Sequence, residues 1–393
     1  MARRPLFYFA ACTIFGATRI ACGLVTRGEI KPDPAHPVLA IGSSAPDFAL
    51  LGVDGKTHKL SDYSDSKVLA VVFTCNHCLA SQLYEGRIGK LYGDYRDKGV
   101  ALVAVNPDNL NQASMEELAW TDVDDSLAGM KDRATYRHLE YPYLYDGGTQ
   151  GVTSKFGVVA TPQIFVFDQG RKLRYEGRID DNVREPLART QDARNAIDAL
   201  LSGRPVPVSQ TQVAGCATKW LGKGSGRDAE MAKINAEPVT LDMATPDVLK
   251  KLRGNGTDKL ALVNFWATWC GPCVNEFSDL QDTYRMYRRR GFDLVTVSSN
   301  EPDEKAAVLE FLQKKHASSR NLLFATTDTY GLQDAFDPKM GGAVPFTLLL
   351  APNGGVLYQE QGELSISKMR RAILANLPDD AEHAGSQAYW SGN

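Results

Sequence analysis

Residues 260–273 have the sequence LALVNFWATWCGPC, a run of apolar and aromatic residues that ends in Cys270-Gly271-Pro272-Cys273. The apolar run is typical of a buried β-strand, and the residues after Cys273 have a helical pattern. A cysteine at a strand-to-helix junction lies at the positive end of the helix dipole, which stabilises its thiolate. This stretch predicts a strand, a redox-active turn and a helix.

The same arrangement occurs earlier in the chain. Residues 67–78 have the sequence KVLAVVFTCNHC, in which Cys75 and Cys78 follow a second apolar run and precede a second helical pattern. At about 150 residues per domain, 393 residues correspond to two or three domains. The chain therefore carries the chemistry of thiol–disulfide exchange twice, in two separate domains.

Strand and helix patterns alternate in both halves of the chain, which predicts an α/β fold with helices on both faces of each sheet. Gly, Pro, Ser and Thr mark the boundary between the halves. The predicted divisions are a signal peptide (1–23), a linker (24–40), a first domain (41–202), an inter-domain linker (203–235), a second domain (236–378) and a flexible tail (379–393).

The N-terminus has the features of an export signal. Residues 1–4 are basic, residues 5–18 are mostly apolar, and the small residues 21–23 offer a cleavage site. The apolar stretch is too short to span a bilayer, which disfavours stable membrane insertion. Lipidation at Cys12 or Cys22 is disfavoured because the sequence before each departs from a lipid-attachment box. We expect an exported protein in the periplasm or another extracytoplasmic compartment.

The composition is that of a soluble globular protein, with 43% apolar and 23% charged residues and a net charge of −3. This charge gives no reason to expect nucleic acid or an anionic membrane as a partner. Seven cysteines are too few and too clustered for a disulfide-stapled scaffold. The expected partners are protein or small-molecule thiols and disulfides, with an upstream electron donor or acceptor.

Two prolines make the pattern more specific. Thr161-Pro162 and Val344-Pro345 each begin an apolar strand well downstream of a CxxC pair, and proline is tolerated at the first residue of a strand. The order strand, CxxC, helix, then proline, strand, hairpin and helix resembles the thioredoxin fold, whose cis-proline loop faces the disulfide. The resemblance implies two tandem thioredoxin folds, roughly 40–202 and 236–378. Each would have a central mixed β-sheet flanked by helices and an insertion between CxxC and cis-proline.

The two domains resemble different branches of the thioredoxin-like superfamily. Residues 265–273, with Glu276 six positions after Cys270, resemble the exported thioredoxin-like reductases that serve cytochrome c maturation. Residues 73–78 resemble the redoxin branch related to peroxiredoxins, which implies a role in redox homeostasis or antioxidant activity. However, the first domain lacks the Pro-x-x-x-Thr-x-x-Cys box of peroxide-reducing members, which argues against efficient peroxidase activity.

Exchange chemistry assigns roles to the four cysteines. Cys270 should be the exposed nucleophile of depressed pKa and Cys273 the more buried resolving thiol, and Cys75 and Cys78 should divide in the same way. A permanent disulfide or a metal half-site is the alternative for either pair. A c-type haem is excluded because neither pair is followed by histidine.

Other residues complete the expected sites. Asn264 stands where thioredoxin has a buried aspartate, so Glu276 is the candidate for proton transfer to or from Cys273. Trp266 is expected in the core and Trp269 at the rim of the site, where a flat aromatic surface helps to dock a peptide. We expect both prolines to be cis, with the backbone at Thr161-Pro162 and Val344-Pro345 pairing with an extended substrate.

His77 and Cys216 add two hypotheses. A cationic imidazole at His77 would stabilise reduced Cys75 and make that disulfide more oxidising, so that electrons flow from Cys270/Cys273 to Cys75/Cys78. The alternative is a solvated histidine with no redox role. Cys216 is either a resolving thiol for a mixed disulfide at Cys75 or an idle thiol.

The sequence thus predicts a thiol–disulfide oxidoreductase without a bound cofactor or metal, possessing two CxxC centres. Two alternatives stay open. One is a thiol-dependent peroxidase, and the other is a metallochaperone or binding module that holds Cu(I) or zinc through one CxxC pair. No Met-rich or His-rich tract supports the second alternative.

Overall fold

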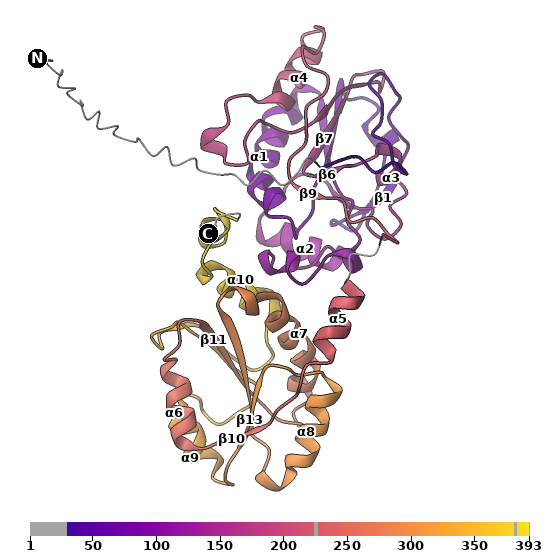
Figure 1. Ribbon diagram of the computed structural model, residues 1–393. Helices are drawn as coiled ribbons and strands as arrows, with labels where there is room; N and C mark the ends of the chain where they lie inside the picture. Colours follow the sequence, from indigo (N-terminus) through magenta and orange to yellow (C-terminus); the bar gives the residue numbers. More distant parts are fainter. Residues whose placement is uncertain (1–29, 224–226, 381–382, 393) are drawn as a thin grey trace, which may run out of the picture.

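The computed structural model describes residues 30–223, 227–380 and 383–392, so the predicted signal peptide lies outside the described residues. Figure 1 shows two α/β units arranged end to end, each a sheet with helices on its faces. Among the described residues, none of the helices is both long and apolar enough to cross a membrane.

The first unit is built on a seven-stranded mixed sheet with the strand order β2-β1-β5-β4-β3-β7-β8. Its elements, in chain order, are β1 (Ala49–Gly52), β2 (Thr57–Lys59), β3 (Val68–Phe73), α1 (Leu79–Tyr95), β4 (Val100–Asn106), α2 (Leu127–Tyr136), β5 (Tyr143–Tyr145), α3 (Thr153–Phe156), β6 (Ala160–Thr161), β7 (Gln163–Phe167), β8 (Leu173–Gly177), α4 (Asp192–Leu201) and β9 (Cys216–Ala217).

The second unit has a six-stranded mixed sheet with the strand order β10-β13-β12-β11-β14-β15. Its elements are β10 (Asp242–Ala244), α6 (Pro246–Gly254), β11 (Leu260–Trp266), α7 (Gly271–Tyr287), β12 (Phe292–Ser298), α8 (Lys305–Lys314), β13 (Arg320–Phe324), α9 (Thr329–Phe336), β14 (Phe346–Leu350), β15 (Val356–Gln361) and α10 (Ile366–Asn376). Helix α5 (Arg227–Asn235) precedes it and helix α11 (Ser386–Ser391) follows it.

The two apolar runs before the CxxC pairs form the central strands, as predicted. Every residue of β3 and of β11 is buried, which matches continuous apolar sequence on a strand covered on both faces. Each is parallel to the next strand, β4 or β12, and antiparallel to the strand after the proline, β7 or β14. Helices and further strands lie between the CxxC helix and the strand after the proline in both units, so the predicted tandem thioredoxin fold and its insertions are confirmed.

The segment expected to be the inter-domain linker, residues 203–235, contains the short strand β9 and the helix α5 among its described residues. β9 pairs antiparallel with β6, so the segment completes the first unit and brings Cys216 opposite Thr161. Trp220 is buried and stacks on His36, and α5 forms the connection to the second unit. The segment is thus attached to the first unit at β9 and Trp220, while most of its side chains before Thr218 are exposed.

The segment before the first domain is also packed where it is described. The Leu39 N–H donates to the Phe156 carbonyl oxygen at 3.0 Å, and Asp33 forms an ion pair with Lys223. Residues 30–40 are thus held against the first unit rather than acting as a free linker, whereas residues 24–29 lie outside the described residues.

The two units share a packed interface. The Tyr287 hydroxyl at the end of α7 donates to the Thr121 carbonyl oxygen at 2.6 Å, and the Arg290 guanidinium lies 3.4 Å from the centroid of the Trp120 ring. Asp122, fully buried, accepts from Arg371 of α10. Apolar packing and buried ion pairs together fix the two units relative to each other.

The prediction of a flexible tail at residues 379–393 is wrong for its described part. Trp390 is buried, and the Tyr389 hydroxyl donates to the Glu85 carboxylate of the first unit. The Arg133 guanidinium, also buried, lies 5.0 Å from the Trp390 ring. Two aromatic side chains in a polar segment thus dock α11 on the first unit, Tyr389 through its hydrogen bond to Glu85 and Trp390 through the contact of its ring with Arg133.

Candidate active sites

Both CxxC pairs lie just beyond the carboxyl ends of the central strands, where an open α/β sheet leaves a crevice for ligands. Cys75 and Cys78 follow β3, and Cys270 and Cys273 follow β11. The same spacing in sequence nevertheless produces two different local structures, because the helix after each pair begins at a different position.

In the second unit, Cys270 is the N-cap of α7 and forms a disulfide with Cys273. Pro272 occupies the first turn, a position where its missing N–H costs no hydrogen bond. The Cys273 N–H donates to Cys270 Sγ at 3.3 Å, so the first cysteine receives a helix N-terminal donor. Cys270 is 6% exposed and Cys273 1%, so Cys270 is less exposed than expected but is the more accessible of the pair.

The cis-proline loop lies beside this disulfide. Val344-Pro345 is a cis peptide bond, as expected, and Val344 packs in the apolar cluster that contains Cys270 and Cys273. Trp266 is fully buried in that cluster, whereas Trp269 is 66% exposed, so both tryptophan predictions are confirmed. A groove of about 560 Å³ runs past Trp269 and Val344.

Glu276 lies one helical turn after Cys273 on α7, with its side chain buried. One oxygen, Oε2, accepts from the Leu364 N–H at 3.0 Å, and the other has no hydrogen-bond partner among the described residues. Burial raises the pKa of Glu276 to about 7, against the opposing hydrogen bonds from Leu364 and Asn264. A carboxyl with this pKa can both hold and release a proton near neutral pH.

In the first unit, Cys75 and Cys78 are not disulfide-bonded and both are buried, at 2% and 0% exposure. Helix α1 begins only at Leu79, which makes Cys78 the N-cap. The expectation that Cys75 is exposed and lies at the helix N-terminus is therefore wrong. The reason is that residues 76 and 77 are held in a loop by the Asp125 carboxylate and the Asp124 carbonyl oxygen instead of starting the helix.

The electrostatics of the pair follow this geometry. Burial raises the pKa of Cys75 well above its usual value, and the nearby charge of Asp108 adds to the rise. Burial also opposes ionisation of Cys78, but hydrogen bonds from Cys216 and Cys75 and the charge of His77 hold the pKa of Cys78 well below its usual range. The surroundings thus favour ionisation of Cys78 over ionisation of Cys75, the reverse of the predicted division of roles.

Thr161-Pro162 is also a cis peptide bond, and it faces the first pair as expected. Cys75 Sγ lies 3.2 Å from Thr161 Oγ1, and Cys78 Sγ lies 3.3 Å from the Thr161 carbonyl oxygen. Because both thiols contact this one residue, the cis-proline loop covers the pair and limits access to it.

His77 is buried, which excludes the alternative of a solvated histidine. Its Nδ1 is hydrogen-bonded to Asp125, which also accepts from the Asn76 N–H at 2.6 Å and from Asn106 Nδ2 at 3.0 Å. Burial alone would lower the pKa of His77, but the charge and hydrogen bond of Asp125 raise it to about 9.

Two buried carboxylates near this centre, Asp108 and Asp125, were missed by the sequence analysis. Asp108 follows β4 and accepts from the Lys219 N–H at 2.7 Å. Burial raises the pKa of Asp108 to about 6, and the charge of Asp125 contributes to the rise. Asp108 follows a predicted strand and Asp125 lies in a polar segment. These positions only weakly indicated a functional role, because acidic residues are common in loops.

Cys216 lies at the first centre rather than in a free linker. Its backbone pairs with Thr161, and its thiol hydrogen-bonds to Cys78. A cleft of about 1470 Å³ between the units opens here and is lined by His77, Pro162 and Cys216 on one side and by Arg289 on the other. Cys216 is half-buried, so it is the most accessible of the three thiols.

The two centres lie at opposite ends of helix α7. Cys270 caps its N-terminus, whereas Tyr287 at its other end contacts Thr121 of the first unit. Gln82 joins that region to the first centre, because its Nε2 donates to both the Trp120 and the Asn76 carbonyl oxygens. A helix of 17 residues is about 25 Å long, so the two pairs of sulfurs cannot meet in this arrangement.

Each of the two units matches a known protein family. Residues 41–176 match the AhpC/TSA family, and residues 232–373 match the Redoxin family. The thiol-disulfide oxidoreductase ResA of Oceanobacillus iheyensis is 30% identical over 143 residues, which cover 36% of this chain and 66% of that protein. The protein of the same name from Geobacillus kaustophilus is 33% identical over 130 residues, covering 33% of this chain and 68% of that one.

The chain spans 66% of the first of these relatives and 60% of its Bacillus subtilis counterpart. Among solved structures, an uncharacterized conserved protein from Geobacillus kaustophilus is 34% identical, with a TM-score of 0.42. The alignment covers 47% of this chain and 94% of that protein.

Proposed function

This chain belongs to the thioredoxin superfamily as a tandem protein related to the ResA thiol-disulfide oxidoreductases, and we propose that it catalyses thiol–disulfide exchange through two distinct centres. The observation that carries the proposal is the second centre. There a Cys270–Cys273 disulfide caps a helix and lies beside a cis-proline, with an exposed tryptophan at its rim.

At the second centre, reduced Cys270 attacks a substrate disulfide, which releases one substrate thiol and forms a mixed disulfide. Cys273 then attacks Cys270 Sγ, so that the second substrate thiol leaves and the Cys270–Cys273 disulfide forms. Glu276 takes the proton from Cys273 as that thiol becomes the attacking thiolate. Two electrons and two protons pass to the substrate in one cycle.

The groove at this centre indicates how a substrate docks. Trp269 and Val344 lie on it, and its rim carries three acidic residues, Glu301, Asp303 and Glu304. The Val344-Pro345 backbone would pair with an extended peptide, and the acidic rim favours substrates with basic residues near the disulfide.

At the first centre, the burial of Cys75 and Cys78 favours exchange through Cys216. The Cys216 thiolate attacks Cys78 Sγ of a Cys75–Cys78 disulfide, and Cys75 leaves as a thiolate that takes up a proton. This transfers the disulfide to the half-buried Cys216 beside the cleft, where an external thiol can reach it.

The sequence also suggested a more specific hypothesis, that electrons pass from one centre to the other. The length of α7 argues against direct exchange within one chain, so a relay would need a diffusing thiol or partner protein that visits both centres. We also propose that the protein acts in an extracytoplasmic compartment. Such compartments are oxidising, so dithiols there need a reductant to stay reduced.

Trapping of mixed disulfides tests the proposal. In the second centre, Cys273→Ser should retain substrates on Cys270. In the first centre, Cys75→Ser should trap more partner than Cys78→Ser, because the surroundings lower the pKa of Cys78 and raise that of Cys75. The absence of any Cys270-linked adduct from Cys273→Ser would reject the exchange mechanism.

A thiol-dependent peroxidase is a second candidate, favoured by the match of residues 41–176 to the AhpC/TSA family. Peroxide consumption that is lost in Cys75→Ser and retained in Cys270→Ser would support it. If the protein consumes peroxide no faster than free thiols do, the peroxidase function is rejected.

A further inference from the structure

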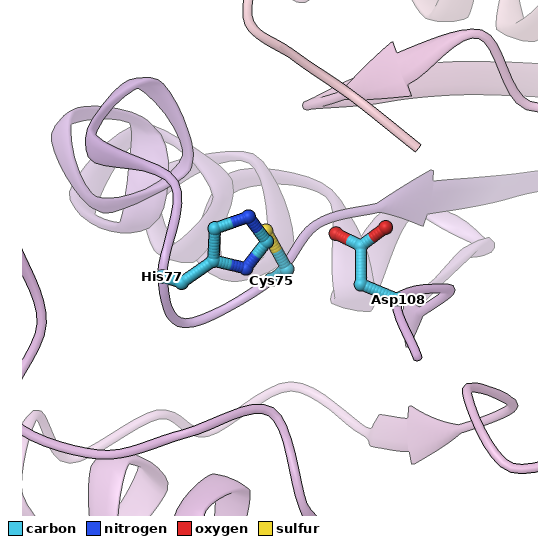
Figure 2. Close-up of side chains that lie close together, drawn as sticks. All are labelled: Cys75, His77 and Asp108. Atoms are coloured by element: carbon cyan, nitrogen blue, oxygen red, sulfur yellow. The ribbon is translucent and has the colours of Figure 1, made fainter. Parts of the chain in front are cut away.

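A second kind of chemistry is present at the first centre. Cys75, His77 and Asp108 bring a sulfur, a ring nitrogen and a carboxylate oxygen within 4.8 Å of one another. Figure 2 shows the three side chains gathered together, with the Asp108 carboxylate facing the His77 ring and the Cys75 sulfur. All three residues are buried, at 2%, 2% and 1% exposure.

Two polar atoms of this cluster have no protein partner. His77 Nε2 and Asp108 Oδ2 are buried and have no hydrogen bond to any described residue. Buried polar groups in folded proteins are almost always paired, because each unpaired one costs free energy. Two such atoms beside a buried thiol indicate a place that a ligand completes.

Hydrogen bonds from neighbouring residues hold His77 and Asp108 so that their unpaired atoms are available to a ligand. Asp125 occupies His77 Nδ1, which leaves Nε2 as the nitrogen available for a bond. The Lys219 N–H holds Asp108 Oδ1 at 2.7 Å, which fixes the carboxylate with Oδ2 available. In metal sites, a histidine that binds the ion through one ring nitrogen usually donates the N–H of its other ring nitrogen to a group such as a carboxylate.

We propose that Cys75, His77 and Asp108 bind Zn²⁺ when the first centre is reduced. Thiolate, imidazole and carboxylate are all ligands that zinc accepts, and the mixed set is too soft for Ca²⁺ or Mg²⁺ and too hard for Cu(I). One thiolate and one carboxylate balance the charge of the ion within a buried site. Three protein ligands leave the fourth tetrahedral position for water or a solute.

The geometry requires a small adjustment. Ligand atoms around tetrahedral zinc lie roughly 3.4–3.6 Å apart when the bonds are about 2.0–2.3 Å long. The cluster spans up to 4.8 Å, so the three side chains must approach by about an ångström. The approach falls on the segments that carry the ligands, because Cys75 and His77 lie in a loop and Asp108 follows the end of β4.

The site goes beyond the proposed exchange activity and makes the two states of Cys75 mutually exclusive. Binding replaces the Cys75 thiol proton and the proton on His77 Nε2 with bonds to zinc, so two protons are released to solvent and no oxidation state changes. Oxidation of Cys75 and Cys78 to a disulfide by an external disulfide removes the sulfur ligand, and the ion leaves. Zinc therefore protects the reduced first centre.

Titration with metal alone tests the proposal. The full chain carrying Cys270→Ser and Cys273→Ser, fully reduced and freed of reductant, is titrated first with Co²⁺ and then with Zn²⁺. We expect one Co²⁺ per chain with a thiolate-to-cobalt absorption band, and displacement of that cobalt by Zn²⁺. The band should disappear in Cys75→Ser.

Two further variants separate this site from a simple CxxC site. Asp108→Asn keeps the bond to Lys219 and should weaken Zn²⁺ binding at least about tenfold, and Asp125→Asn should weaken it about 10- to 100-fold. Glu116→Gln, an exposed acidic control, should have no effect. Circular dichroism establishes that each variant is folded.

The proposal is overturned if reduced protein binds no Co²⁺ at micromolar concentration. It is equally overturned if folded Asp108→Asn binds zinc as tightly as the parent protein, because the thiols alone would then be the ligands. Both outcomes are independent of disulfide reduction at Cys270/Cys273, which is measured on the chain with those cysteines intact.

Discussion

The two CxxC centres share one spacing and one place in the fold, yet they differ in which cysteine meets the helix. In the second unit α7 begins at Gly271, so Cys270 is the N-cap, whereas in the first unit α1 begins at Leu79 and Cys78 is the N-cap. Asn76 and His77 are held in a loop by the Asp124 carbonyl oxygen and by Asp125. A shift of three residues in a helix start thus places the second cysteine, instead of the first, at the positive end of the helix dipole, which favours its thiolate form.

The largest expected effect separates the centres by activity. Reduction of an accessible disulfide such as insulin should fall to the rate without protein in Cys270→Ser. It should change less than about twofold in Cys75→Ser, because the first pair is buried beneath Thr161. Turbidity of precipitating insulin measures both rates, and equal losses would show that the two centres act as one.

The next effect tests the buried ion pair that only the first centre has. Asp125→Ala leaves the His77 imidazole buried without its partner and should lower the free energy of unfolding by about 3 kcal/mol. Denaturant unfolding followed by circular dichroism measures it. Asp97→Ala, at an exposed position, is the control and should be neutral.

Proton transfer at the second centre gives a somewhat smaller effect. Glu276→Gln should slow resolution by Cys273 about 100-fold. In the parent protein the rate should rise with pH through about 7, where the carboxyl ionises, and this dependence should be absent in the variant. Single-turnover kinetics from pH 5 to 9 test it, and a retained pH step would assign the proton to another group.

The same carboxyl predicts a stability profile. Its pKa is raised from 4.5 to about 7 in the folded protein, so the folded state holds the proton more tightly than the unfolded state. Its contribution to stability is present below about pH 4.5 and is lost as pH rises through 7. Glu276→Gln should therefore gain stability relative to the parent protein at pH 8 but not at pH 4.

The smallest effect concerns the contact that docks α11 on the first unit. Tyr389→Phe removes the hydrogen bond from α11 to Glu85 and should lower the free energy of unfolding by about 1.5 kcal/mol. Glu85 retains Arg133, so the change is modest. Faster proteolysis of the C-terminal segment would accompany it, and unchanged proteolysis would contradict the docking of α11.

The sequence was sufficient for the fold and for the local geometry of the second centre, apart from the burial of Cys270. Continuous apolar runs, the CxxC pairs and the strand-starting prolines are local signals, and together they predicted two thioredoxin units with cis-Pro162 and cis-Pro345. The WCGPC motif also specifies where the following helix begins, because Pro272 is suited to the first turn of a helix.

The first centre was less predictable because its structure depends on residues distant in the chain. Asp125 and Asp108, which hold His77 and complete the buried cluster, come from two later segments, and nothing in their local sequence separates them from surface acids. Cys216 is placed by strand pairing outside the predicted domain. Helix register and burial at such a site are set by tertiary contacts rather than by local propensity.

The reduction potentials of the two pairs test the central claim, that one motif has been built into two different centres. Potentials are measured separately in Cys75→Ser/Cys78→Ser and in Cys270→Ser/Cys273→Ser, in defined glutathione buffers. Because His77 and the helix N-terminus stabilise reduced Cys78, we predict that the Cys75/Cys78 pair is more oxidising by about 30–150 mV. Equal potentials, or a more reducing first pair, would contradict the account.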